Sequence, residues 1–192
     1  YLISAAYHFR TYYATYPKSE FAEEALFMSA FCNYLDSPGP TLDQTPTKLA
    51  LEELQIFVNA FPKSELVDSA NTLVDKLAYK LEVKEFLNAK QYYTIKKYKS
   101  AVVALNGMLT DYPDTDYAEE IKLLVLKSYY YLAINSIDSK KAERFEEGIE
   151  AYYDFIDNFA DGKDTNEAQV IYAKLVRERE KFLQENPSTD EL

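Results

Sequence analysis

A short phrase that recurs along the chain constrains its fold more than any other sequence feature. In three copies an aromatic residue precedes a proline and a hydroxyl residue follows two positions later, and a fourth copy lacks the proline. The copies are Tyr16-Pro17-Lys18-Ser19, Phe61-Pro62-Lys63-Ser64, Tyr112-Pro113-Asp114-Thr115 and Phe159-Ala160-Asp161-Gly162. The prolines, at positions 17, 62 and 113, are 45 and 51 residues apart. A repeat of this length built from helical patterns predicts a solenoid of helix pairs, and solenoids usually hold a partner rather than catalyse a reaction.

The residues ahead of each proline repeat one helical pattern. A small residue lies twelve positions before the proline (or Ala160), and large apolar residues lie eight, five and one before it. These offsets share one face of a helix with 3.6 residues per turn. The residue before a proline is pushed out of the α region, so the helix ends there, and Ser19, Ser64 and Thr115 are expected to be N-caps of the next helices. The small residues are Ala5, Ala50, Ala101 and Gly148.

This pattern predicts an all-α, TPR-like helix-pair solenoid, wound as a right-handed superhelix, with repeats longer than the usual unit of about 34 residues. Residues 1–192 are interpreted as one domain of three and a half to four repeats, with breaks near Pro17, Pro62, Pro113 and Ala160. A loop is expected at Ser37-Pro38-Gly39-Pro40, one very long helix from Ser64 to Lys97, and a disordered tail over 186–192. The apolar stripe of the long helix slips after Leu81. Its members are Leu66, Ala70, Leu73, Leu77 and Leu81, followed by Phe86, Ala89 and Tyr93.

Composition excludes several classes of protein. Four glycines and seven prolines in 192 residues leave few helix breakers. A net charge of −11 argues against a nucleic-acid partner. No apolar run approaches the roughly 20 residues that a membrane span needs. Because the helical pattern is already under way at Tyr1, the chain is expected to be a fragment without its upstream targeting segment.

The sequence predicts no enzyme and no metal or cofactor site. The only histidine, His8, has no neighbouring ligand residue, and the only cysteine, Cys32, lies in mid-helix, where it is expected to act as a small hydrophobe. Adjacent acids diverge on a helix, so the paired acids are interpreted as solvated faces and partners of the helix dipole rather than as catalytic pairs. These pairs are Glu23-Glu24, Glu52-Glu53, Glu119-Glu120 and Glu146-Glu147.

Tyrosine is unusually abundant, with 18 copies and no tryptophan. Consecutive tyrosines on a helix are about 100° apart and cannot all face the core. One of each set is therefore expected to pack and another to line a groove or a surface, where tyrosine favours binding. For any single tyrosine, packing between helices is the simpler interpretation. The sets are Tyr12-Tyr13, Tyr92-Tyr93, Tyr129-Tyr130-Tyr131 and Tyr152-Tyr153.

Four segments in order resemble the BamD family of outer-membrane assembly lipoproteins, and the similarity extends from about Ala5 to Lys181. They are Ser19-Glu20-Phe21-Ala22-Glu23-Glu24-Ala25-Leu26-Phe27, Leu42-Asp43-Gln44-Thr45, Met108-Leu109-Thr110-Asp111-Tyr112-Pro113-Asp114-Thr115 and Tyr131-Leu132-Ala133-Ile134-Asn135-Ser136.

The resemblance implies a non-catalytic scaffold subunit of the β-barrel assembly (BAM) complex, lipid-anchored on the periplasmic face of the outer membrane. Its implied partners are the periplasmic POTRA domains of BamA, other BAM lipoproteins and unfolded outer-membrane proteins. The implied lipid anchor is expected to lie outside this sequence, because Cys32 is in mid-helix, and the groove for unfolded substrates is expected to be incomplete. The alternative is another periplasmic TPR adaptor lipoprotein, acting in cell division or secretion.

The C-terminal half is the part that the resemblance implies for docking on BamA. Its helices are expected at Thr115 to Ile137, Lys140 to Phe159 and Thr165 to Glu185, with a loop from Ser136 to Lys141. An aromatic platform beside a small basic loop suits an acidic partner. The candidate partner-binding residues are Tyr129, Tyr130, Tyr131, Lys140 and Lys141. The alternative is that Tyr131 only packs and that the lysines only solubilise a turn.

Overall fold

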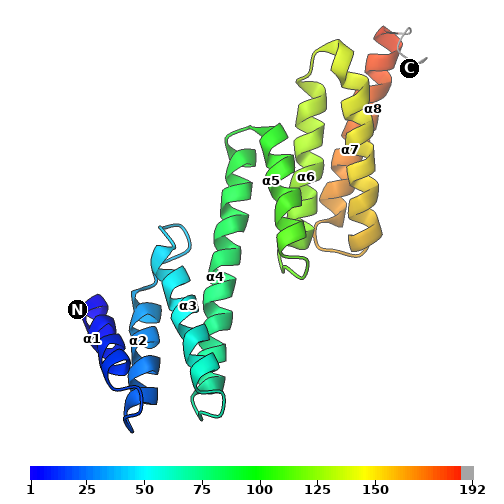
Figure 1. The fold of residues 1–192 in the computed structure, drawn as a ribbon. Helices are drawn as coiled ribbons and strands as arrows, with labels where there is room; N and C mark the ends of the chain where they lie inside the picture. Colours follow the sequence, from blue (N-terminus) through cyan, green and yellow to red (C-terminus); the bar gives the residue numbers. More distant parts are fainter. Residues whose placement is uncertain (187–192) are drawn as a thin grey trace. The chain divides into compact units, whose positions relative to one another are not determined.

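The computed structural model describes residues 1–186 of the chain, and the described part is all-helical with no strand (Figure 1). The predicted tail therefore lies, apart from Asn186, outside the described residues. Consecutive helices pack in pairs, which confirms the predicted TPR-like, helix-pair class. The helices are α1 (Leu2–Thr15), α2 (Ala22–Asp36), α3 (Thr45–Ala60), α4 (Val67–Thr94), α5 (Tyr98–Asp111), α6 (Ala118–Ile134), α7 (Asp138–Phe159) and α8 (Thr165–Glu185).

The chain divides into two compact units, residues 1–84 and 85–192, and α4 belongs to both. This helix has 28 residues, so the very long helix predicted from Ser64 to Lys97 is confirmed with slightly shorter ends. Its stripe contributes Leu73 and Leu77 to the core of the first unit and Phe86 and Ala89 to the core of the second. The slip predicted after Leu81 thus falls where one core ends and the other begins. The number of domains and of repeats stays a prediction.

The face predicted from the offsets before each proline is the buried face. Ala50, Leu54 and Phe57 of α3 are completely buried against α2 and α4 in the first unit, and Ala101 and Leu105 of α5 are completely buried in the second. The small residue is needed most clearly at Gly148 in α7. A Cβ there would lie 2.3 Å from Cδ1 of Leu175 in α8.

The predicted N-caps are displaced from the helix starts. The caps of α2 and α6 are Phe21 and Tyr117, and neither makes a side-chain capping bond. Instead, the hydroxyl oxygens of Ser19, Ser64 and Thr115 each accept the backbone N–H two residues further on, at 3.2, 3.0 and 3.2 Å. Each hydroxyl therefore stabilises a turn that leads into the helix, which is a local alternative to capping.

The interpretation of the paired acids as solvated faces is wrong for several of them. Glu53 is buried in the middle of α3, where Ser29 Oγ and Asn33 Nδ2 of α2 donate to its carboxylate and Arg10 of α1 pairs with it. Glu119 of α6 accepts the backbone N–H of Asp164 at 2.7 Å. Adjacent acids do diverge on a helix, but the divergence turns at least one acid of these pairs towards a neighbouring element instead of turning both to solvent.

Candidate functional site

Four tyrosines from three helices of the second unit meet at the turn between α4 and α5. The ring of Tyr131 stacks on that of Tyr98, with centroids 5.0 Å apart and planes 17° apart. The rings of Tyr93 and Tyr130 also contact the ring of Tyr131, at centroid distances of 6.4 and 5.2 Å. We call these four residues the tyrosine cluster. All four are partly exposed, so the cluster is an aromatic surface and not a closed core.

Three hydroxyls of the tyrosine cluster, those of Tyr93, Tyr98 and Tyr130, have raised pKa values. Burial, followed by the neighbouring Tyr131, Tyr98 and Glu167, raises the pKa of Tyr93 to about 12. Burial also raises the pKa of Tyr98, and burial together with Glu178 raises that of Tyr130. Protonated phenols offer a large apolar face and a hydroxyl that both donates and accepts hydrogen bonds. These properties suit protein binding rather than proton transfer at neutral pH.

Tyr129 belongs to a different surface from its two neighbours. It lines a groove of about 300 Å³ between α5, α6 and α7, together with Lys99, Lys140, Arg144 and Glu147 among others. Burial, followed by the charges of Glu147 and Glu150, raises its pKa. Tyr129 therefore diverges from Tyr130 and Tyr131, whose rings contact each other.

The predicted basic loop from Ser136 to Lys141 is not present. Because α6 ends at Ile134 and α7 begins at Asp138, both lysines lie in the first turns of α7. Asp138 extends α7 towards its N-terminus, where an acid is favoured by the helix dipole. Lys141 pairs with that aspartate at 2.9 Å, and its ammonium group lies 5.5 Å from the centroid of the Phe182 ring.

The predicted partner-binding residues do not form one surface: Lys141 lies over Phe182 of α8, and the other four divide between the groove and the tyrosine cluster. Lys140 pairs with Glu143 at 3.2 Å and lines the groove with Tyr129, whereas Tyr131 lies with Tyr93 and Tyr98. The two partners of Tyr131 were missed as site residues. Tyr93 is a member of the apolar stripe predicted for the long helix. Tyr98 comes back to Tyr93 through a turn that contains no proline. Lys96 makes this turn with a positive φ of 59°.

The single histidine and the single cysteine of the chain lie in different settings. His8 is exposed and its ring makes an edge contact with Tyr7, with centroids 5.6 Å apart. Cys32 is buried in α2, and burial followed by the charge of Glu53 raises the pKa of its thiol. Within residues 1–186, no three His, Cys, Asp or Glu side chains are grouped to hold a metal ion. None of the helices in this range is long and apolar enough to cross a membrane.

Comparison with protein families matches residues 1–145 to the family described as outer membrane lipoprotein YfiO. The matched range includes the whole tyrosine cluster and both lysines. No curated protein matches the chain closely enough to be counted as a relative. The family is an outer-membrane lipoprotein family, as the resemblance to BamD implied. Because the match covers well over half of the chain, this protein belongs to the YfiO family of outer membrane lipoproteins.

Proposed function

We propose that this protein is a BamD-type, non-catalytic scaffold subunit of the machinery that assembles β-barrel proteins in the outer membrane. In this proposal it docks on the periplasmic POTRA domains of BamA and helps to deliver or insert barrel proteins. Family membership supports the outer-membrane setting. The observation that carries the docking role is the tyrosine cluster, a partly exposed aromatic surface of the kind enriched at protein interfaces.

The docking surface combines this cluster with the groove that Tyr129 shares with Lys140. Lys140 and Lys141 form ion pairs with Glu143 and Asp138 in the first turns of α7, and Lys141 also lies over the ring of Phe182 in α8. Exposed ion pairs of this kind contribute at most about 1 kcal/mol, so the lysines can exchange these acids for those of a partner at little cost. Electrostatic attraction would then guide the approach, and the aromatic rings would supply the contact area.

The remaining parts of the proposal follow the family. The protein is placed on the periplasmic face of the outer membrane through a lipid on a cysteine other than Cys32, since that residue is buried in α2. Other BAM lipoproteins and unfolded outer-membrane proteins are its further proposed partners.

A binding titration against the purified periplasmic domains of BamA from the same organism tests the proposal. We expect saturable binding that the double change Lys140→Glu and Lys141→Glu weakens about tenfold, because it reverses two charges at the surface. Lys174→Glu, an exposed lysine of α8, is the matched control and should leave affinity unchanged.

Tyr131→Ala tests whether the aromatic ring contributes to binding. Tyr131→Phe is its control, because phenylalanine keeps a ring that stacks on Tyr98. Circular dichroism must show that each variant is folded. Absence of binding by the folded protein would refute docking on BamA and would favour a different periplasmic TPR adaptor. Binding that is insensitive to all of these changes would place the interface elsewhere on the chain.

A further inference from the structure

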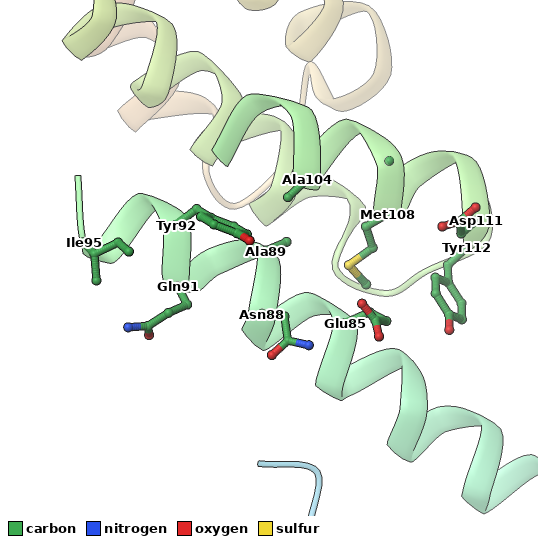
Figure 2. A pocket seen from close by; sticks show the side chains of 11 residues that line it. Glu85, Asn88, Ala89, Gln91, Tyr92, Ile95, Ala104, Met108, Asp111 and Tyr112 are labelled. Carbon is green, nitrogen blue, oxygen red and sulfur yellow. The ribbon is translucent and has the colours of Figure 1, made fainter. Parts of the chain in front are cut away.

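A groove separate from the tyrosine cluster runs between the second half of α4 and α5, entirely within the second unit. Its volume is about 560 Å³. Figure 2 shows its side chains, with Glu85, Asn88 and Gln91 arranged along α4 and Met108, Asp111 and Tyr112 along α5. The floor is apolar, formed by Ala89, Ala104 and Met108.

The two ends of the groove differ in character. Glu85, Asp111 and Tyr112 lie at one end, whereas Tyr92 and Ile95 lie towards the turn between the two helices (Figure 2). Tyr92 and Ile95 are large side chains that are nearly half exposed, at 44% and 49%. One end is therefore acidic and the other apolar.

The acidic end has no countercharge. Within residues 1–186, the side chains of Glu85, Asn88, Gln91 and Asp111 have no hydrogen-bond or ion-pair partner, and no lysine or arginine of that range lines the groove.

Four other helix contacts of this unit, those of α4 with α6, α6 with α7, α6 with α8 and α7 with α8, have an acid paired with a cation across them. These pairs are Lys90–Glu120, Lys122–Asp154, Lys127–Glu167 and Arg179–Glu146. The α4–α5 groove thus has two carboxylates and two amides available to a ligand, and its charge suits a cationic one.

Gly107 gives a second reason to regard the groove as a binding site. It lies in the middle of α5, where glycine costs about 1 kcal/mol relative to alanine. Neither backbone conformation nor packing requires it, because its φ is not positive and a Cβ there would meet nothing within 4 Å. Gly148 and Gly162 differ, since a Cβ at either would clash with Leu175 or Glu119. A side chain at position 107 would fill the groove, because this residue lines it.

We propose that the α4–α5 groove binds an extended segment of another protein that carries a lysine or arginine near a bulky apolar residue. The basic side chain lies between Glu85 and Asp111, and the apolar side chain packs on Tyr92 and Ile95 over the floor at Met108. Ile95, the residue after the end of α4, follows Glu85 by ten positions, which is about 15 Å at 1.5 Å per residue of helix. An extended peptide covers about 3.4 Å per residue, so the two anchor residues are about four positions apart. The amides of Asn88 and Gln91 face the peptide backbone between them.

The probe is a fluorescein-labelled ten-residue peptide of glycine and serine with one arginine and, four positions away, one phenylalanine. We expect saturable binding by fluorescence anisotropy. Replacing the arginine of the peptide by glutamate should weaken binding about tenfold, because it places an acid beside two acids. Raising the salt concentration should weaken binding of the arginine peptide as well.

Two variants of the full chain locate the binding site. A Cβ at position 107 meets nothing within 4 Å, so the leucine of Gly107→Leu is expected to extend into the groove and should weaken binding about tenfold. Asn106→Leu is the matched control, because it adds the same side chain at the adjacent, exposed position outside the groove, and it should not alter affinity. The double change Glu85→Lys and Asp111→Lys should weaken binding of the arginine peptide and strengthen that of the glutamate peptide.

Three results would overturn the proposal. These are the absence of saturable binding at millimolar peptide, equal binding of the arginine and glutamate peptides, and unchanged binding by a folded Gly107→Leu variant. Because none of these substitutions lies in the tyrosine cluster or at Lys140 and Lys141, titration of the same variants against BamA domains separates this groove from the proposed docking surface.

Discussion

Arg10 of α1 pairs with the carboxylate of Glu53 of α3, although the two residues belong to helices that are not consecutive. The Glu53 side chain is only 4% exposed, and Ser29 and Asn33 of the intervening α2 donate to it at 3.0 and 2.6 Å. A buried carboxylate is tolerated only when it is paired and fully hydrogen-bonded. Glu53 thereby fixes three helices of the first unit relative to one another.

Glu53→Gln should destabilise the first unit by about 2 kcal/mol, because a neutral amide loses the charge that strengthens each bond and offers one acceptor oxygen in place of two. Urea denaturation measures the free energy of unfolding. The matched control is Glu52→Gln, an exposed neighbour, which should change stability by at most about 0.5 kcal/mol. Equal effects of the two substitutions would show that the buried network does not stabilise the fold.

Gly148→Ala and Gly107→Ala should change stability in opposite directions. At Gly148 the new methyl group meets the completely buried Leu175, so we expect a loss of about 1–3 kcal/mol from overpacking. At Gly107 the methyl group meets nothing, so the higher helix propensity of alanine should raise stability by up to about 1 kcal/mol. Thermal and urea unfolding of both variants test the pair. If Gly148→Ala is neutral, α7 and α8 can move apart without cost and the close approach is not required.

Gly162→Ala should act through Glu119. A Cβ at position 162 would lie 2.2 Å from Oε1 of Glu119, the atom that accepts the backbone N–H of Asp164. Displacing the carboxylate should cost about 1.5–3 kcal/mol, the contribution of a hydrogen bond to a charged group. In a Glu119→Ala background the same glycine substitution should cost little, since the clash and the bond are both gone. A double-mutant cycle measures this coupling, and additive effects would refute it.

The sequence predicted the helices well where local signals mark their limits. The bounds of α8 agree with the expected Thr165 to Glu185, and the slip of the apolar stripe marks where α4 leaves one core and enters the next. The N-terminus of α7 lies two residues earlier than the predicted Lys140, because the polar segment expected to be a loop forms its first turn. Its first residue, Asp138, favours a helix start, but the two lysines that follow carry no local signal that distinguishes a helical turn from a loop.

The sequence could not predict contacts that depend on how helices pack. Glu52 and Glu53 are identical in kind and adjacent, yet one is exposed and the other is buried beneath Arg10. Hydrophobic periodicity does not identify a buried charge, because its partners come from other helices. The stack of Tyr131 on Tyr98 was missed for the same reason, since it depends on the turn at Lys96.

The raised pKa of Tyr93 predicts that stability falls in alkaline solution. Its folded-state pKa of about 12 lies above the ordinary value of 10.0, because burial and the neighbours Tyr131, Tyr98 and Glu167 disfavour the phenolate. Between these two values the unfolded chain loses the proton while the folded chain keeps it, so this contribution to stability is complete below pH 10 and is lost as the pH rises through 12. Tyr93→Phe should flatten the decline in unfolding free energy over that pH range. In an ultraviolet absorbance titration, it should also remove the tyrosine ionisation that occurs at the highest pH. A variant that declines as steeply as the parent protein, or that loses an early transition instead, would show that Tyr93 is not held protonated by the cluster.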